Sequence, residues 1–357
     1  MTCGASATAF ARKFAHSAAV ENSGHGKQVS GVSAASLTPD TLNLEEKMPS
    51  LNQLHVDEAL TQISIAYRNQ AFVAEEVLPV VPVMKKNDVF FRFSKQHFRA
   101  YKDAYAAGQR AQQIEVDLDT RGFYMCDGHA LEDSITDDER EQADPSAQIE
   151  IEKTEKLTNI IALNEEIAFF NNVVNATVIT QNQTLSGTSQ WSDYVNSDPV
   201  SEVLKERRLV QQQIGDFPNY LLVSQPVMDT LANHPRILDR VKYTANGARN
   251  QLDEQDLARV FKVDKVLVSA AVYQTANEGE ADNLGYIMGK NALLFYRPPR
   301  PGLRVPTFGY TFFWAKRSGV LRWRELSLES DFIRVKKFYS QQVVAPNAAY
   351  LWVNATT

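Results

Sequence analysis

The 357-residue sequence predicts an α+β protein in which a mixed α/β segment is inserted into a second body rich in strands. Three observations predict this class. A single long amphipathic helix lies near the middle of the chain, a two-stranded ribbon precedes it, and helices alternating with short strands follow it. Segments rich in β-formers then return near the C-terminal end. We expect them to pair with early strands and with the long helix.

Composition bounds the class of protein. The net charge of −6 argues against a protein that wraps nucleic acid through bulk electrostatics. No run of 18 apolar residues is present, so no membrane span is predicted. Cys3 and Cys126 are the only cysteines, too few for a disulfide framework, and they fit a reducing cytoplasm.

The first 54 residues are rich in Ala, Ser, Thr and Gly, with Phe10 and Phe14 their only aromatic residues. Such a segment cannot bury enough apolar area to offset the entropy lost on ordering. We therefore expect an arm that a neighbouring subunit holds in place. The folded body should begin with a short helix over 56–67. An extended segment over 77–83 should follow at a sheet edge or a bend, because two prolines forbid helix there.

Residues 85–130 contain two runs with period-two alternation around a polar tip at 104–108. One run places Val89, Phe91 and Phe93 on one face, and the other alternates Ile114, Val116 and Leu118 with acids. This pattern predicts a long two-stranded ribbon. An isolated ribbon is marginal in water, so it should lie on another surface.

The charges of this region are polarised. The first limb and tip of the ribbon are basic, with Lys85, Lys86, Arg92, Lys95, Arg99, Lys102 and Arg110, whereas the segment 115–155 is dominated by acids. This pattern favours contacts between copies, and the candidate contact residues are Lys95, Arg99, Lys102, Asp137, Asp138 and Glu139. The alternative interpretation is a pair of solvated faces.

The long helix is predicted over 145–175. Asp144 suits the N-cap, and Pro145 suits the first helical position, where its missing N–H costs nothing. At 1.5 Å per residue the helix would span about 45 Å. Its apolar stripe consists of Leu157, Ile160, Ile161, Ile167, Phe170 and Val174. The alternative is an ordinary core helix or half of a coiled-coil hairpin, but no heptad is sustained.

The α/β segment begins with Asp198 and Pro199, which repeat the same capping pattern before a helix that Gly215 should end. Short helices and strands then alternate, with strands expected at 220–223, 266–273 and 285–289. The returning β-rich segments lie at 310–314, 320–324, 332–335, 343–345 and 350–353.

Candidate catalytic chemistry is sparse. Gly285 to Asn291 resembles a phosphate loop only superficially, because three residues separate its glycines and Asn replaces the Ser or Thr that binds magnesium. Cys126 and His129 offer a thiol and an imidazole without a third orienting group. The six histidines show no ligand spacing. The residues thus predict no catalytic, cofactor-binding or metal site, although a soluble enzyme using Cys126 and His129 stays an alternative.

The order of these parts resembles the major capsid proteins of tailed bacteriophages, which have the Hong Kong-97-type fold. The residues that carry the resemblance are Asp198-Pro199 with the following helix and Phe217–Ser224, then Pro226–Pro235, then Gly289–Leu294 with a Pro/Arg run and Tyr310–Trp314. The resemblance covers about residues 50–357.

The resemblance implies a division into an N-terminal arm, an extended loop, a peripheral domain and an inserted axial domain. Its expected limits are 1–54 for the arm, 55–83 for the start of the peripheral domain, 84–132 for the extended loop, 133–195 for the peripheral domain with its spine helix at 145–175, 196–318 for the α/β axial domain and 319–357 for returning strands of the peripheral domain.

The implied function is structural and not enzymatic. Copies would form hexamers and pentamers of an icosahedral shell that encloses double-stranded DNA without reading its sequence, in a virion assembled in the host bacterial cytoplasm. Scaffold, portal and cement proteins are possible partners, and no cofactor or membrane is expected. Some relatives crosslink Lys to Asn. Lys95 and Lys102 lie in the corresponding loop, but no partner Asn is identified. An encapsulin-like nanocompartment shell is the alternative.

Overall fold

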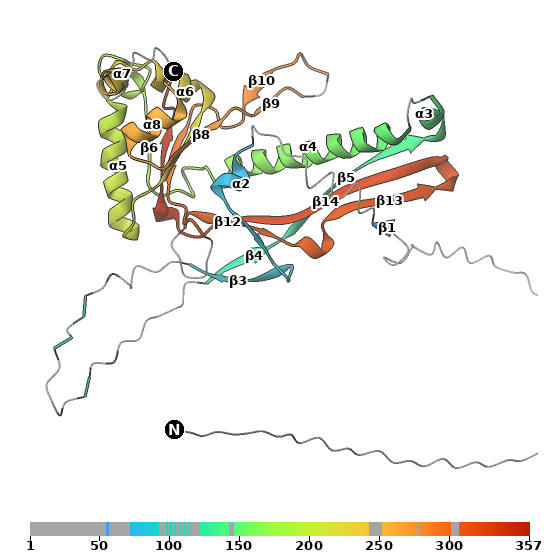
Figure 1. Cartoon of the computed structure of the whole chain (residues 1–357), viewed down its shortest axis with the longest axis horizontal. Coiled ribbons are helices and arrows are strands. Elements are labelled where there is room, and N and C mark those ends of the chain that lie inside the picture. Colours follow the sequence, from blue (N-terminus) through green and yellow to red (C-terminus); the bar gives the residue numbers. More distant parts are fainter. Residues whose placement is uncertain are drawn as a thin grey trace, which may run out of the picture. The chain divides into compact units, whose positions relative to one another are not determined.

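The structure is a computed structural model in which two larger sheets and two two-stranded ribbons carry the strands (Figure 1). The parts that it describes belong to one unit, Pro49–Thr357. They are residues 55–56, 72–92, 98, 100–101, 103–104, 108, 110–111, 113, 121–142, 146–242, 252–277, 279–300 and 307–357. The predicted arm and residues 57–67 of the predicted first helix lie outside this range.

The first sheet is organised around β14 (Ser330–Val343), a 14-residue strand. Its order is β1-β13-β14-β12-β2, and β5 pairs with β14 as well. The other strands are β1 (His55–Val56), β2 (Val80–Pro82), β5 (Asp127–Thr136), β12 (Gly309–Phe313) and β13 (Gly319–Glu325). The extended segment predicted at 77–83 is confirmed in part: Val80–Pro82 forms the edge strand β2, which pairs only with β12 among the described strands, whereas Val77 is the last residue of the helix α2 (Ala74–Val77).

The long helix is confirmed as α4 (Ser146–Asn172), 27 residues in length. Leu157 and Ile161 pack with Ile333 of β14 in a small core against the first sheet. Phe169 and Phe170, near its other end, belong to the large core that surrounds the second sheet. The helix therefore contributes to both cores. Asp144 and Pro145, the predicted cap, lie outside the described residues, and the short helix α3 (Asp137–Gln142) precedes them.

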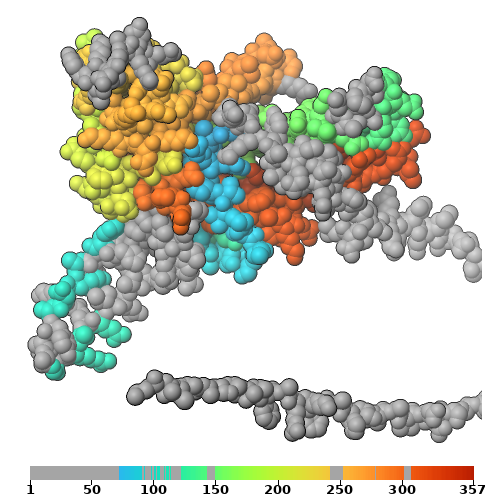
Figure 2. Space-filling model, in the orientation of Figure 1, coloured from blue at the N-terminus to red at the C-terminus, as the bar shows by residue number. Residues whose placement is uncertain are grey.

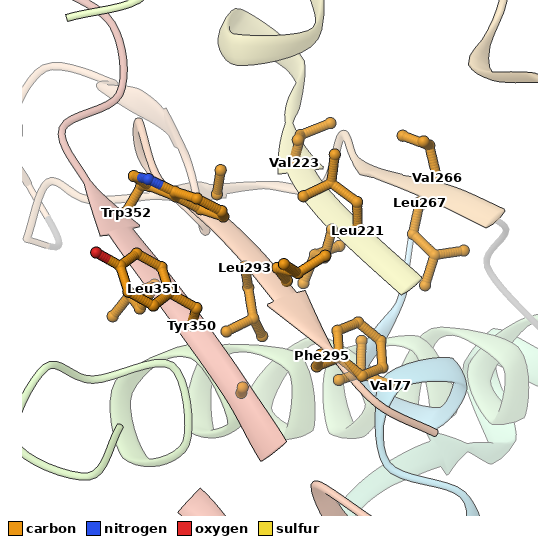
Figure 3. Close-up of a cluster of buried hydrophobic side chains, with 14 of the residues drawn as sticks. Val77, Leu221, Val223, Val266, Leu267, Leu293, Phe295, Tyr350, Leu351 and Trp352 are labelled. Carbon is orange, nitrogen blue, oxygen red and sulfur yellow. The ribbon is translucent and has the colours of Figure 1, made fainter. Parts of the chain in front are cut away.

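The second sheet has the order β6-β15-β11-β7-β8. Its strands are β6 (Asn182–Thr184), β7 (Tyr220–Ser224), β8 (Lys265–Ser269), β11 (Ala292–Phe295) and β15 (Ala349–Val353). Figure 3 shows Leu221, Leu293, Phe295 and Trp352 among the side chains that fill its core. The inner strands β7, β11 and β15 carry apolar residues almost without interruption, as expected for strands buried on both faces, whereas the edge strand β6 is polar and exposed.

Four helices accompany the second sheet: α5 (Pro199–Ile214), α6 (Gln225–Ala232), α7 (Pro235–Lys242) and α8 (Glu254–Phe261). The predicted caps of α5 are confirmed. Asp198 Oδ1 accepts the N–H of Ser201 at 3.1 Å, and Gly215 ends the helix in the left-handed region with φ 85°. The described residues also form α2 (Ala74–Val77) and 3₁₀ turns that include Gly187–Ser189, Ala315–Arg317, Leu326–Leu328 and Pro346–Ala348.

The expected pairing of the closing strand is wrong. Tyr350–Val353 lies in β15, which is hydrogen-bonded to β11 and β6 of the second sheet and not to the early strands. Conversely, β12 falls within the predicted 196–318 segment but pairs with β2 and β14 of the first sheet. The physical reason is that β-propensity reports a half-buried or buried strand and not the identity of its neighbours.

Two ribbons complete the described structure, and each is a two-stranded sheet of its own. One joins β3 (Asn87–Phe91) to β4 (Arg121–Met125). The other joins β9 (Val272–Gln274) to β10 (Leu284–Tyr286).

Candidate functional site

The candidate nucleophile Cys126 is fully buried. Its thiol approaches the carbonyl oxygen of Phe312 at 3.5 Å, and burial raises its pKa. His129 is exposed on β5, where its ring stacks on Tyr339 at 4.5 Å between centroids. A fully buried thiol with a raised pKa and an exposed imidazole on β5 do not form an activated nucleophile–base pair. The geometry gives no support to the enzyme alternative.

A serine and a histidine that the sequence analysis missed do meet. Ser197 Oγ lies 3.1 Å from Nε2 of the buried His234. Nδ1 of His234 accepts the N–H of Arg236, so Nε2 carries the proton and donates it to Ser197, which donates in turn to the carbonyl of Asp193. Burial lowers the pKa of His234. With its proton on this nitrogen the imidazole cannot act as base toward the hydroxyl, so the contact fastens the start of α7 to the loop before α5.

A cluster of buried charges joins α2, α4 and β14. The carboxylate of Glu166 accepts the backbone N–H groups of Val73 at 3.0 Å and Ala74 at 2.9 Å. Lys337 of β14 lies 2.5 Å from Glu165 and 3.1 Å from Glu75. Desolvation raises the pKa of Glu166 to about 7 and also raises that of Glu165. These contacts hold α2 on the long helix. No local sequence pattern indicated them, because the partners are about 90 to 260 residues apart.

The predicted acidic contact residues lie on α3. Arg324 binds Asp137 with two hydrogen bonds of 2.9 and 2.5 Å and thereby lowers the pKa of its carboxyl. Lys153 lies 2.9 Å from Glu139, whereas Asp138 is exposed without an ion pair among the described residues. Lys95, Arg99 and Lys102 lie outside the described residues. The pairing of these two groups between copies therefore stays a prediction.

The predicted ribbon is confirmed at its base, where β3 and β4 pair with Val89 opposite Phe123. The side of the ribbon opposite Val89 faces inward. Phe90 and Tyr124 are buried against Phe312, with ring centroids 5.4 and 4.3 Å away. The reason lies in Gly122, because a Cβ there would come within 2.2 Å of the Phe90 ring. Residues 114–118 lie outside the described range.

The opposite side of this ribbon is apolar and exposed. We define the ribbon face as Val89, Phe123 and Met125, whose side chains are between 45% and 56% exposed. Lys85, Lys86 and Arg92 lie at the two ends of β3 and are exposed as well. The ribbon thus presents an apolar strip with basic residues beside it.

The hairpin of β9 and β10 has a second exposed apolar side. We define the hairpin face as Val272, Leu284 and Tyr286, which are between 42% and 69% exposed. Val272 pairs directly with Tyr286, so the two side chains share one side. Hydrogen bonds from Gln274 to Asp282 at 2.6 Å and from Thr275 to the carbonyl of Asn283 at 2.8 Å brace the turn end. Figure 2 shows this hairpin in orange at the surface of the molecule.

No group of three or more His, Cys, Asp or Glu side chains among the described residues could hold a metal ion. In the same ranges, each helix is too short or too polar to cross a bilayer. The loop at Gly289 is a turn that holds the chain end, since the carbonyl of Lys290 accepts the N–H of Ala355 at 2.7 Å.

Comparison with known sequences finds phage proteins. The chain is 27% identical over 304 residues to a protein described as "Major capsid protein" of Burkholderia phage BcepMu, covering 83% of this chain and 95% of the relative. It is 27% identical over 306 residues to the "Major capsid protein" of Pseudomonas phage JBD67, covering 84% of this chain and 97% of the relative. No protein-family model matches the chain.

Comparison with solved structures also finds phage-related proteins. A phage-related protein from Bordetella bronchiseptica RB50 superposes with a TM-score of 0.68 at 22% identity, covering 85% of this chain and 98% of that one. The capsid of cyanophage P-SCSP1u superposes with a TM-score of 0.54 at 10% identity, covering 82% and 90%. At these identities the likeness establishes the fold. The chain is therefore a homologue of phage major capsid proteins and has their Hong Kong-97-type capsid fold, as its sequence resemblance implied.

Proposed function

We propose that this chain is the structural subunit of a phage capsid and that its work is assembly and not catalysis. The observation that carries the proposal is the alignment with two phage major capsid proteins, which covers 95% and 97% of their lengths. The side chains agree with it. Cys126 is buried with a raised pKa, and the Ser197–His234 pair has the wrong proton arrangement for a nucleophile and its base.

The finer architecture of the shell is also proposed. Copies form hexamers and pentamers of an icosahedral shell in the virion, assembled in the bacterial cytoplasm with scaffold, portal or cement proteins as possible partners. The shell encloses double-stranded DNA without reading its sequence. The net charge of −6 supports a wall that does not bind the genome tightly, since DNA carries about one charge per 1.7 Å and small cations screen it.

The two sheets support a division into domains with shifted limits. We assign the first sheet and α4 to the peripheral domain and the second sheet with α5–α8 to the axial domain. In this division β15 belongs to the axial domain and β12 to the peripheral one, because each follows the strands to which it is hydrogen-bonded. Residues 84–132 form the extended loop, with β3 and β4 as its base.

We propose that the loop residues Lys95, Arg99 and Lys102 contact the α3 acids of a neighbouring copy. Asp138 supports this contact most directly because it is exposed and lacks an ion pair within the described ranges. Asp137 and Glu139 would share their carboxylates with Arg324 and Lys153. An exposed pair contributes only about 0–1 kcal/mol, so the effect must come from repetition around the shell.

Negative-stain electron microscopy of the expressed protein, after a sizing column, tests the proposal. Closed polyhedral particles or rings of uniform size are expected. A protein that stays monomeric under all assembly conditions, with and without scaffold, would contradict it. Particles filled with protein in place of DNA would identify the nanocompartment alternative.

A further inference from the structure

The hairpin of β9 and β10 exposes apolar side chains to solvent in the single chain. Its two strands have three residues each and form a sheet of their own. A two-stranded hairpin is marginal in water unless another surface covers one face. The hairpin face nevertheless stays open in the single chain, with all three apolar side chains gathered on one side. Gathered apolar residues mark interaction surfaces more often than isolated ones do.

The ribbon of β3 and β4 repeats this arrangement. One of its sides packs on Phe312 through Phe90 and Tyr124, and the other side is the open ribbon face. The chain thus carries two different exposed apolar faces on two separate ribbons. A head-to-tail contact between identical subunits requires two different patches of this kind, and such contacts generate rings when the rotation closes.

The charges beside the two faces are opposite. The hairpin segment 271–288 contains Glu278, Glu280 and Asp282 and no lysine or arginine, and Glu280 and Asp282 are exposed. The ribbon face is flanked by three exposed basic residues, Lys85, Lys86 and Arg92. The nearby acids are Asp88, which Lys85 approaches at 3.1 Å, and the exposed Asp127, so the flank is basic on balance. Opposite potentials at an apolar contact favour one orientation and suppress others.

We propose that the hairpin face of one copy docks on the ribbon face of the next copy, with Glu280 and Asp282 beside Lys85 and Lys86. Both complementary faces are present on the same chain, so the occupant is a second copy and not an unrelated protein. The inference rests on the proposed function, because it requires that copies assemble. The proposed contact is separate from the predicted contact at Asp137–Glu139, which does not involve the hairpin.

Thiol crosslinking tests this contact directly. In a Cys3→Ser background, Phe123→Cys and Leu284→Cys place one thiol on each face, and a short bismaleimide is added to assembled particles. Cys126 is buried and should not react. A ladder of covalent multimers is expected from the double variant, and neither single variant should produce more than a trace. Val195→Cys with Leu326→Cys is the matched control, since these positions are 80% and 81% exposed but lie on neither face.

The outcomes separate the two proposals. Particles that form normally but give a ladder no stronger than the control pair would overturn the docking contact and leave the capsid role intact. Failure of the unmodified chain to form any particle would instead count against the capsid role. A strong ladder from the Phe123→Cys and Leu284→Cys variant, with none from the control pair, supports both the docking contact and the capsid role.

A charge swap provides a second, independent measurement. Glu280→Lys with Asp282→Lys should lower the yield of particles several-fold, and adding Lys85→Glu with Lys86→Glu should restore most of it. Asp216→Lys with Glu325→Lys is the control, because it changes the net charge equally at exposed acids elsewhere. An equal loss in the control, or no rescue by the swap, would contradict the contact. Circular dichroism of the unassembled variants verifies that they fold.

Discussion

The two sheets of this chain are held together by different means. The second sheet lies in a continuous apolar core, where Leu221, Leu293 and Trp352 are fully buried. The first sheet has two small apolar cores, one with α4 and one with the ribbon of β3 and β4. It also has a network of charges at one end, in which Asp331 contacts Arg140, Arg322 and Arg324. One half of the subunit is therefore stabilised mainly by a single large apolar core, whereas the other combines smaller apolar cores with long-range ion pairs.

The largest effect is expected from the core of the second sheet. Phe295→Ala removes a fully buried ring that lies 5.5 Å from Tyr220 and 5.9 Å from Phe308, measured between centroids. The free energy of unfolding should fall by about 3–5 kcal/mol, from lost burial and the cavity left behind. Denaturant unfolding of the unassembled subunit measures it. Leu326→Ala, on an exposed side chain, should change it by less than about 0.5 kcal/mol.

The polar contacts between α2 and α4 should show a pH dependence of their own through Glu166. Its pKa is raised from 4.5 to about 7, so the folded state holds this proton more tightly than the unfolded state. The resulting stabilisation is complete below about pH 4.5 and is lost as pH rises through about 7. At about 1.36 kcal/mol per pKa unit, a shift of this size corresponds to at most about 3–4 kcal/mol. The Glu165 carboxyl shifts in the same direction.

Glu166→Gln isolates this contribution. The variant cannot titrate at residue 166, so the difference in unfolding free energy between it and the unmodified chain should change steeply between pH 4.5 and 7. Comparing the two chains at each pH largely removes the Glu165 effect, which both share. A difference that stays constant across this range would contradict the raised pKa.

Asp331→Asn should weaken the charge network of the first sheet. Asp331 is nearly buried, and its loss leaves three arginines without a shared carboxylate. The expected cost is about 2 kcal/mol, below that of a fully buried pair because the arginines are partly exposed. Glu132→Gln is the matched control. Its exposed pair with Arg334 should contribute less than about 1 kcal/mol, and a larger effect there would reverse the ranking.

The smallest loss of stability is expected from the N-cap of α5, which lies in the same half of the subunit as Phe295. Asp198→Ala removes the cap of α5, where the carboxylate accepts the N–H of Ser201 and pairs with Arg236 at 2.8 Å. A loss of about 1 kcal/mol is expected in thermal or denaturant unfolding. Asp198→Asn keeps the acceptor and should recover most of it. A loss as large as that of Phe295→Ala would show that local capping and not burial dominates this half.

The elements that could be predicted from the sequence are those set by patterns of residues close together along the chain. The stripe on α4, the Asp198 and Gly215 caps of α5, and the proline-bound edge strand β2 all arise from neighbours along the chain. The inward face of β3 could not be predicted, because it depends on the space that Gly122 leaves for Phe90 across the ribbon. The sheet that holds β15 and the partners of Glu166 could not be predicted for the same reason: they are set by contacts between distant segments.

The long strand β14 has a consequence for engineering the subunit. It fixes three partners at once, pairing with β13 over Ser330–Lys336, with β5 over Ser330–Tyr339 and with β12 over Tyr339–Val343. Side chains alternate between the faces of a strand, so a slip of one residue exchanges the buried and exposed sets. A one-residue insertion near Lys336 would therefore misalign the three strands together. Foreign peptides for display should therefore be inserted outside β14.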